Sequence, residues 1–316
     1  CYSPGQINDA SANFKMADDV SVLRKAMEGL GTTEKKLVDV LTQRSNAQRL
    51  LISDAYQKAT GRALIDDLKS DTGGDFEDVL VALVTPPDVY DCREIISAIK
   101  GAGTTESVLT EMFASRTNKQ IVAFSAAYLA GKRRNLTQLL PLWPDKILCY
   151  ASSNGKRDES TKVDAAKAKA DAKILYEAGE KKWGTDESKF VDILCHSSVP
   201  QLRQTMVEYK SISKKSLQES IEGEMSGNLE DLLVAIVKCA KSTPTYLAER
   251  LFKGMKGPGT TESILTRIIV SRSELDLLDI RADYKKLFGT SLYSALTSEV
   301  SGDYGECLKR LCGGED

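Results

Sequence analysis

The chain has 316 residues, of which 41% are apolar, and its 43 Lys and Arg against 45 Asp and Glu leave a formal net charge of −2. This near balance argues against nucleic acid as a partner, because proteins that bind nucleic acid usually present a basic face. It also argues against attachment to an anionic membrane by a polybasic patch alone.

Nothing in the sequence indicates export or membrane insertion. No stretch approaches the roughly 20 apolar residues that a transmembrane helix needs. The first residues lack the pattern of a secretory signal. The seven cysteines are scattered, without a CxxC pair, which indicates reduced thiols. We therefore expect a cytoplasmic protein.

A short loop pattern occurs four times along the chain. Its versions are GLGTTE from Gly29, GAGTTE from Gly101, KWGTDE from Lys182 and GPGTTE from Gly257. The last glycines of these loops lie 72, 81 and 75 residues apart, a period that indicates a repeat array.

Each loop is followed by apolar residues at positions i, i+3 and i+4, which predicts a helix with one face on a core. In chain order these residues are Leu37, Val40 and Leu41; Leu109, Met112 and Phe113; Phe190, Ile193 and Leu194; and Leu265, Ile268 and Ile269. The Thr or Asp after the last glycine can cap this helix. The next glutamate falls in the first turn, where the helix dipole favours it.

The rest of each unit also recurs, as in QRSNAQRLLISDAY and SRSELDLLDIRADY. No segment alternates with the period of two that strands show. We therefore predict an all-α chain of four repeats with about five helices each, whose apolar faces cover one another. The predicted boundaries are a tail at 1–14 and repeats at 15–86, 87–157 (with an atypical second half), 158–244 (with a linker) and 245–316.

An acidic residue follows the last loop glycine at a distance of 40 residues in three of the four copies, where it begins a short polar loop. The pairs are Gly31 and Asp71, Gly184 and Glu224, and Gly259 and Glu299. Glycine lets a loop turn several carbonyls outward, and carbonyls with one bidentate carboxylate suit Ca²⁺, which takes 6–8 oxygen ligands. Three carbonyls and one carboxylate supply about five, leaving room for water or a lipid phosphate oxygen. Such a site would bridge an acidic protein and an anionic membrane.

Four repeats of about 70 residues, each with a KGxGT-like loop, resemble the annexin family. The run AGEKKWGTDE and the ending SLYSALTSEVSGDYGECLKRLCGGED are similar to vertebrate members. The resemblance covers about residues 15–316 except part of the second repeat. It implies a curved, disc-like superhelical array of four repeats with calcium loops on the convex face. It also implies calcium-dependent binding to anionic phospholipid membranes, peripheral attachment when calcium rises, and no enzymatic activity.

The resemblance implies the calcium ligands residue by residue. In the first, third and fourth repeats they are Met27, Gly29, Gly31 and Asp71; Gly179, Lys182, Gly184 and Glu224; and Met255, Gly257, Gly259 and Glu299. A secondary site of the family corresponds to Thr32 and Glu34, Thr104 and Glu106, Thr185 and Glu187, and Thr260 and Glu262. For these glutamates a second interpretation stays open, in which they only complement the helix dipole.

Two further residues attract a functional interpretation. Trp183 lies in the third loop, where it is expected either to contact lipid when calcium binds or to pack in a core. His196, the only histidine, is expected to stand where the other copies carry Arg44, Arg116 and Arg272. A structural role is expected for His196, because no nucleophile motif accompanies it.

The second repeat departs from the pattern. Forty residues after Gly103 the sequence has Trp143 in place of an acid, and Asp145 lies two residues further on. Pro141 and Pro144 disfavour a regular helix there. Three carbonyls without a carboxylate leave Ca²⁺ short of ligands, so we expect poor binding or none at the main site of this repeat.

A different class of function remains an alternative, namely an α-helical protein-interaction scaffold with little calcium dependence. In that case the loops are plain turns, and partners bind the concave face or the tail. The tail at 1–14 is a candidate surface for a protein partner in either case. A third interpretation, a hydrolase of lipids or phosphate esters, lacks a catalytic constellation in the sequence.

Overall fold

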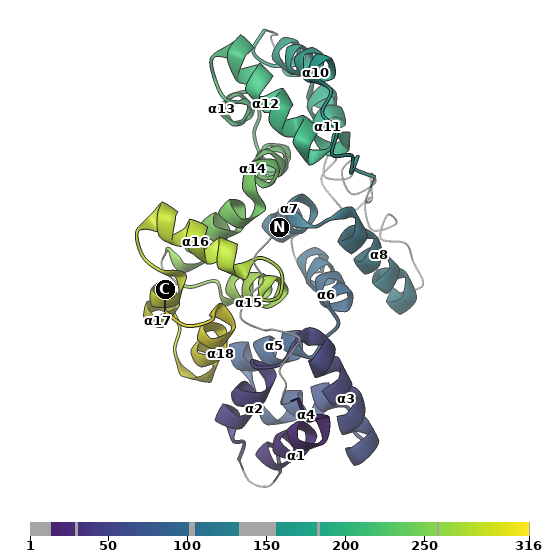
Figure 1. Cartoon of the computed structure of the whole chain (residues 1–316), viewed down its shortest axis with the longest axis vertical. Helices are drawn as coiled ribbons and strands as arrows, with labels where there is room; N and C mark the ends of the chain where they lie inside the picture. The colour runs from purple at the N-terminus through teal and green to yellow at the C-terminus, as the bar shows by residue number, and fades with distance from the viewer. Residues whose placement is uncertain are drawn as a thin grey trace. The chain divides into compact units, whose positions relative to one another are not determined.

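The computed structural model describes residues 14–28, 31–100, 105–132, 156–181, 184–257 and 259–315. Within these ranges the regular structure is α-helical and no strand occurs, which confirms the all-α prediction. Figure 1 shows the helices coloured from purple at the N-terminus to yellow at the C-terminus. The repeat boundaries and the disc-like shape stay predictions.

The first copy of the repeat is described almost completely. Its helices are α1 (Met16–Ala26), α2 (Glu34–Leu41), α3 (Asn46–Thr60), α4 (Leu64–Asp71) and α5 (Gly74–Leu83). The second copy begins with α6 (Pro87–Ile99), α7 (Glu106–Ser115) and α8 (Asn118–Lys132). The atypical stretch begins at Leu136, and its residues up to 155, Trp143 and Asp145 among them, lie outside the described part of the chain.

The third and fourth copies share one long helical element. The third has α10 (Ala165–Ala178), α11 (Glu187–His196), α12 (Val199–Ser213), α13 (Leu217–Glu224) and the first part of α14 (Asn228–Met255). The fourth has the second part of α14, then α15 (Glu262–Arg272), α16 (Leu277–Phe288), α17 (Leu292–Glu299) and α18 (Gly302–Cys312). Ser242 interrupts α14 with extended backbone, φ −160° and ψ 112°. The Ser242 hydroxyl accepts the N–H of Thr245 at 3.2 Å, as an N-cap does, so α14 is two consecutive helices.

The helices divide into two compact units. One contains the chain up to Pro87 and from Leu247 onward, and the other contains Asp88–Tyr246. In the first unit α15 packs on α5, and α18 packs on α2 and α5 (Figure 1). The buried Arg49 donates to the carbonyl of Leu83 at 2.8 Å and pairs with Glu274 at 3.2 Å, which joins the first and fourth copies. Burial lowers the pKa of Arg49 to about 10.

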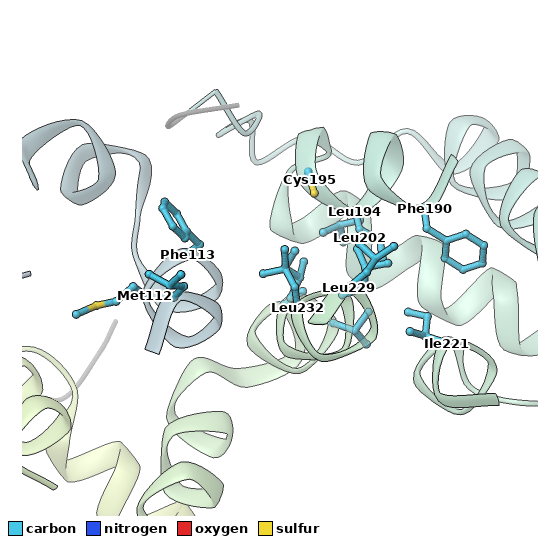
Figure 2. Packing of buried hydrophobic residues seen from close by; sticks show 14 of the residues in the cluster. Met112, Phe113, Phe190, Leu194, Cys195, Leu202, Ile221, Leu229 and Leu232 are labelled. Atoms are coloured by element: carbon cyan, nitrogen blue, oxygen red, sulfur yellow. The ribbon is translucent and has the colours of Figure 1, made fainter. Parts of the chain in front are cut away.

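The second unit is held by one cluster of buried apolar side chains that joins the second and third copies. Figure 2 shows part of it, where Leu194, Leu202 and Leu229 come from α11, α12 and α14. All residues of the predicted apolar stripes are buried except Ile193, which is half-buried. The cysteines that the structure describes are free and buried, as expected for reduced thiols: Cys92, Cys195, Cys239, Cys307 and Cys312.

A buried ion pair ties the first helix of a copy to the end of its second helix. In the first copy Nε and Nη2 of Arg44 contact the two carboxylate oxygens of Asp19 at 2.7 and 3.0 Å. In the second copy Arg116, the C-cap of α7, contacts both carboxylate oxygens of Asp91 at 2.8 and 2.9 Å. Both carboxylates are therefore compensated inside the protein.

The third copy keeps the carboxylate of this pair but not the arginine. The C-cap of α11 is Ser197, whose backbone (φ −70°, ψ 147°) matches that of Arg116 (φ −85°, ψ 145°). The expectation that His196 stands at the arginine position is therefore wrong by one residue, because α11 ends at His196 and this exposed side chain lies on its last turn. Asp171, the counterpart of the two paired aspartates, is buried, its Oδ2 has no hydrogen-bond partner, and burial raises its pKa.

Replacing Ser197 with Arg is expected to restore the pair and to stabilise the protein by ~1–3 kcal/mol, because an uncompensated buried charge is strongly destabilising. Since the pKa of Asp171 is raised in the folded state, its contribution to stability is present while it is protonated and is lost as the pH rises through that pKa. The gain from Arg should therefore be larger near neutral pH than in acid. Denaturant unfolding at both pH values measures this difference.

Ser197→Met is the matched control, because it adds a side chain of similar reach without charge. It should give no gain that grows with pH. An equal gain from Met and Arg at both pH values would show that packing, rather than pairing with Asp171, stabilises this position.

Candidate metal-binding loops

The four loops close in the same way. A backbone N–H near the start of the second helix donates to the carbonyl of a residue near the end of the first, at 2.8–2.9 Å. These pairs are Thr33 to Ala26, Thr105 to Ala98, Asp186 to Ala178, and Thr261 to Gly254. The second loop thus keeps this closing contact, although its residues 101–104 lie outside the description.

A threonine hydroxyl connects each of the other three loops to the acid 40 residues after the loop glycine. Thr32 donates to the carbonyl of Asp71 at 3.0 Å. Thr185 donates to the carbonyl of Glu224 at 3.1 Å. In the fourth copy Thr260 donates to the carboxylate of Glu299 itself, at 3.5 Å. The constant spacing in the sequence therefore corresponds to proximity in space.

The acid occupies the same structural position in each case. Asp71, Glu224 and Glu299 are the last residues of the short helices α4, α13 and α17. Glu224 and Glu299 are exposed, and Asp71 is half-buried. A negative charge at a helix C-terminus is unfavourable by about 0.3–1 kcal/mol. Helix stability therefore does not explain why an acid recurs at this point in three copies.

The loop backbone at the last glycine requires glycine. Gly31 has φ 100° and Gly184 has φ 81°, in the region that other residues rarely adopt. An added Cβ would meet no atom within 4 Å at either position, so the constraint is the backbone conformation and not space. These glycines let the loop reverse direction between the two helices.

The predicted ligands fall into two groups. The structure describes Met27, Gly31 and Asp71 in the first loop, Gly179, Gly184 and Glu224 in the third, and Met255, Gly257, Gly259 and Glu299 in the fourth. Gly29, Lys182, Trp183 and Thr104 lie outside the described residues. The assignment of the described residues as ligands stays a prediction.

The predicted secondary glutamates are each the first residue of a helix: Glu34 of α2, Glu106 of α7, Glu187 of α11 and Glu262 of α15. This position is compatible with both interpretations of these residues. The N-cap residues directly before them make no side-chain capping hydrogen bond, so the expectation of side-chain caps here is wrong. The backbone accounts for this, because these N-caps have ψ of 79–85°. The serines that do cap a helix, such as Ser45 and Ser216, have ψ of 161° and 154°.

The available donors are mainly oxygens. Among the residues that the structure describes, no group of three or more His, Cys, Asp or Glu side chains is placed to hold a metal ion. A cation at these loops would therefore depend on backbone carbonyls and one carboxylate, a donor set that suits a hard cation such as Ca²⁺. In the same described part of the chain, no helix has the length and apolar character needed to cross a membrane.

The sequence interpretation missed one side-chain contact of the third loop. Glu180, in the third loop, accepts a hydrogen bond from Ser220 of α13 at 2.6 Å. The available signal was the spacing from Gly179 to Gly184, which is one residue longer than that from Met27 to Gly31. The spacing showed an insertion, but not where its side chain would lie.

Comparison with known proteins agrees with this architecture. The Annexin family model matches residues 18–83, 90–140, 170–236 and 246–311. Annexin A3 from Bos taurus is 50% identical over 99% of this chain and 97% of its own length. The solved structure of annexin III, 48% identical, superposes with a TM-score of 0.96 over 100% of this chain and 98% of the other.

A calcium-bound structure, that of annexin (Sm)1, is 31% identical, with a TM-score of 0.84 over 100% of this chain and 94% of the other. The family match covers most of the chain in four segments, as the four loop copies require. The second match ends at residue 140, inside the stretch where the sequence departs from the pattern. The chain belongs to the annexin family, whose members are known generally as calcium-dependent phospholipid-binding proteins without enzymatic activity.

Proposed function

We propose that this chain binds anionic phospholipid surfaces through calcium held at its first, third and fourth loops. The observation that carries the proposal is the contact between each loop threonine and the acid 40 residues beyond the loop glycine. A plain turn between two helices needs no acid beside it, whereas a site for a hard cation needs a carboxylate within reach of the loop carbonyls. The calcium in the solved annexin (Sm)1 relative supports the choice of metal.

Each proposed site combines backbone carbonyls with one carboxylate. The ligands are Met27, Gly29, Gly31 and Asp71; Gly179, Lys182, Gly184 and Glu224; and Met255, Gly257, Gly259 and Glu299. Bound Ca²⁺ would supply the positive charge between the loop and the lipid phosphates. The chain contributes too few oxygens to complete a shell of 6–8, so binding should be weak without lipid and tighter when a phosphate oxygen completes it. The loops are proposed to lie on the convex face of the array.

The charge of the chain explains why the metal is needed. The net charge is −2, so the protein has no excess of basic residues to hold an anionic surface. The loops themselves add carboxylates at the proposed contact, which repel lipid phosphates unless a cation lies between. We therefore infer peripheral, reversible attachment of a cytoplasmic protein, controlled by calcium concentration.

The second copy is proposed to contribute little to this binding. Its loop closes like the others, and its sequence has Ile99, Gly101 and Gly103 at the positions that match the carbonyl ligands. The position of the acid is occupied by Trp143. A loop that supplies carbonyls alone leaves the charge of Ca²⁺ uncompensated. The alternative function, a protein-interaction scaffold, makes a different prediction for all four loops. In that case calcium should have little effect on the binding of any partner.

Replacing Asp71, Glu224 and Glu299 together with Ala is expected to abolish binding to phosphatidylserine vesicles at calcium concentrations that saturate the unaltered protein. Each substitution removes the single carboxylate of one main site. The unaltered protein should sediment with vesicles in calcium and be released fully by a chelator. Folding should survive, because the acids lie at helix ends near the surface. Calcium-dependent sedimentation of the triple variant at the original level would contradict the ligand assignment.

A second triple variant, in which Glu34, Glu187 and Glu262 become Gln, separates the two interpretations of the glutamates that begin α2, α11 and α15. If they complement only the helix dipole, the variant loses about 0.3–1 kcal/mol of stability per helix and keeps its calcium requirement. If they hold secondary ions, the calcium concentration for half-maximal vesicle binding rises. Vesicle sedimentation and thermal unfolding on the same samples distinguish these results.

Trp183 is proposed to contact lipid when calcium fills the third site. Calcium and anionic vesicles together should shift the tryptophan emission to the blue and protect it from an aqueous quencher, because the indole enters the membrane interface. Trp183→Phe should remove this change, while Trp143 remains as the second tryptophan. Emission from Trp183 that is already blue in the free protein and does not respond to vesicles would support a buried side chain.

A further inference from the structure

The third loop differs from the others by one residue. Its closing hydrogen bond joins residues eight apart, Ala178 and Asp186, whereas the bonds from Thr33 to Ala26 and its counterparts join residues seven apart. Gly179, the C-cap of α10 that begins this loop, has φ −111° and ψ −101°. A Cβ there would lie 3.2 Å from the ring of Phe190, so a larger residue would fit only if this ring moved by a few tenths of an ångström.

The side chain that follows turns back against the protein. Glu180 exposes only 14% of its side chain, although it lies in a loop. Its Oε1 accepts the hydroxyl of Ser220 at 2.6 Å and lies 3.5 Å from the hydroxyl of Ser213. The ammonium group of Lys215 lies 3.8 Å from the same oxygen. The carboxylate of Glu180 therefore connects the loop to α13 and to the turn that precedes this helix.

Ser220 lies one helical turn before Glu224, and residues four apart share a face of a helix. Ser220 is also 1% exposed, so its hydroxyl is fixed within the packed part of α13. A hydrogen bond from Ser220 to Glu180 thus holds the third loop at a constant distance from the helix end that carries its acid. The contact from Thr185 to the carbonyl of Glu224 fixes the other end of the same loop.

In the described parts of the first and fourth copies, the position of Ser220 is occupied by residues that make no such connection. In the first copy the residue that corresponds to Ser220 is Asp67, which accepts the hydroxyl of Tyr56 at 2.6 Å and pairs with Arg62 at 3.0 Å. In the fourth copy the corresponding residue is Ala295. In the first copy the acid belongs to the short helix and binds residues outside the loop. In the third copy the acid belongs to the loop itself.

We propose that Glu180 is a positioning residue that prearranges the third loop against Glu224 and so raises the affinity of this loop for calcium. The proposal rests on the proposed function of the loops. Preorganisation acts by reducing the conformational freedom that the loop loses when it binds. A charge-assisted hydrogen bond to an almost buried carboxylate is strong enough to hold such a loop.

The test uses the full chain with Asp71 and Glu299 replaced by Ala, so that the third loop alone keeps its acid. The measured quantity is the calcium concentration for half-maximal sedimentation with phosphatidylserine vesicles. Glu180→Gln should raise this concentration about tenfold, because an amide oxygen accepts a weaker hydrogen bond from Ser220 than a carboxylate does. Ser220→Ala should raise it by about threefold or more. The double variant should raise it by less than the product of the two single effects, because both changes act on the same contact.

Glu177→Gln is the matched control. It removes the same charge three residues away, where the partner of Glu177 within the described residues is the exposed Lys181, at 3.6 Å. It should leave the calcium concentration unchanged. Circular dichroism and thermal unfolding confirm that all variants fold.

The proposal is overturned if the Glu180→Gln variant needs the same calcium concentration for half-maximal sedimentation as the protein without this substitution. It is also overturned if Glu180→Gln weakens binding while Ser220→Ala does not, since Glu180 would then act by its charge or as a direct ligand. An equal effect of Glu177→Gln would likewise show a general effect of charge. Failure of the proposed function looks different, because the unaltered protein would then show no response to calcium.

Discussion

The contact between a loop threonine and a residue 40 positions beyond the loop glycine is the constraint on which the proposed sites depend. Thr32 and Thr185 reach the carbonyl of the acid, and Thr260 reaches a carboxylate. The carbonyls and the carboxylate of each site come from different helix pairs. A displacement of either segment by a few ångströms would separate the carboxylate from the carbonyls, because ligands of Ca²⁺ lie 2.3–2.6 Å from the ion.

The packing beneath the loops keeps this distance constant. Three residues before each acid stands a leucine or isoleucine with no exposed surface, namely Leu68, Ile221 and Leu296. The backbone carbonyl of each of these three residues also accepts the N–H of the residue that follows the acid. The end of the short helix is therefore fixed by apolar burial on one side and left open to solvent on the other. Substitutions at these buried positions would affect both stability and the site, because a cavity allows the helix end to move.

The four copies share one frame but satisfy their buried polar groups differently. An arginine compensates the buried aspartate of the first helix in the first two copies, whereas Asp171 in the third has no such partner. The hydroxyl of Tyr56 donates to the carboxylate of Asp67 in the first copy. In the third copy the hydroxyl of Ser220 donates to the carboxylate of Glu180. The copies thus share their buried apolar residues and the hydrogen bond that closes each loop, while the polar contacts around each loop differ from copy to copy. This leaves room for loops of unequal affinity within one chain.

Much of the architecture could be predicted because it depends on periodic features. The spacing of the loop glycines, the apolar stripes and the constant distance to the acid are all visible in the sequence, and the stripes face the core as expected. Side-chain partners were harder to predict, because they depend on tertiary contacts. Side-chain caps were expected at the start of α2, α7, α11 and α15, but their N-cap residues make none. The end of α11 places Ser197 rather than His196 at the arginine position. Glu180 was missed because an insertion reveals an extra residue without showing where its side chain points.

The central claim is that a loop binds calcium where it has both its carbonyls and an acid beside them. A crystal structure of the full chain soaked in calcium tests this directly. The account predicts ions at the first, third and fourth loops, each with an oxygen of Asp71, Glu224 or Glu299 at about 2.3–2.6 Å, and no fully coordinated ion at the second loop. A fully coordinated ion held by the Gly101 and Gly103 carbonyls with an acidic side chain, or ions at the other loops without those three acids, would contradict it.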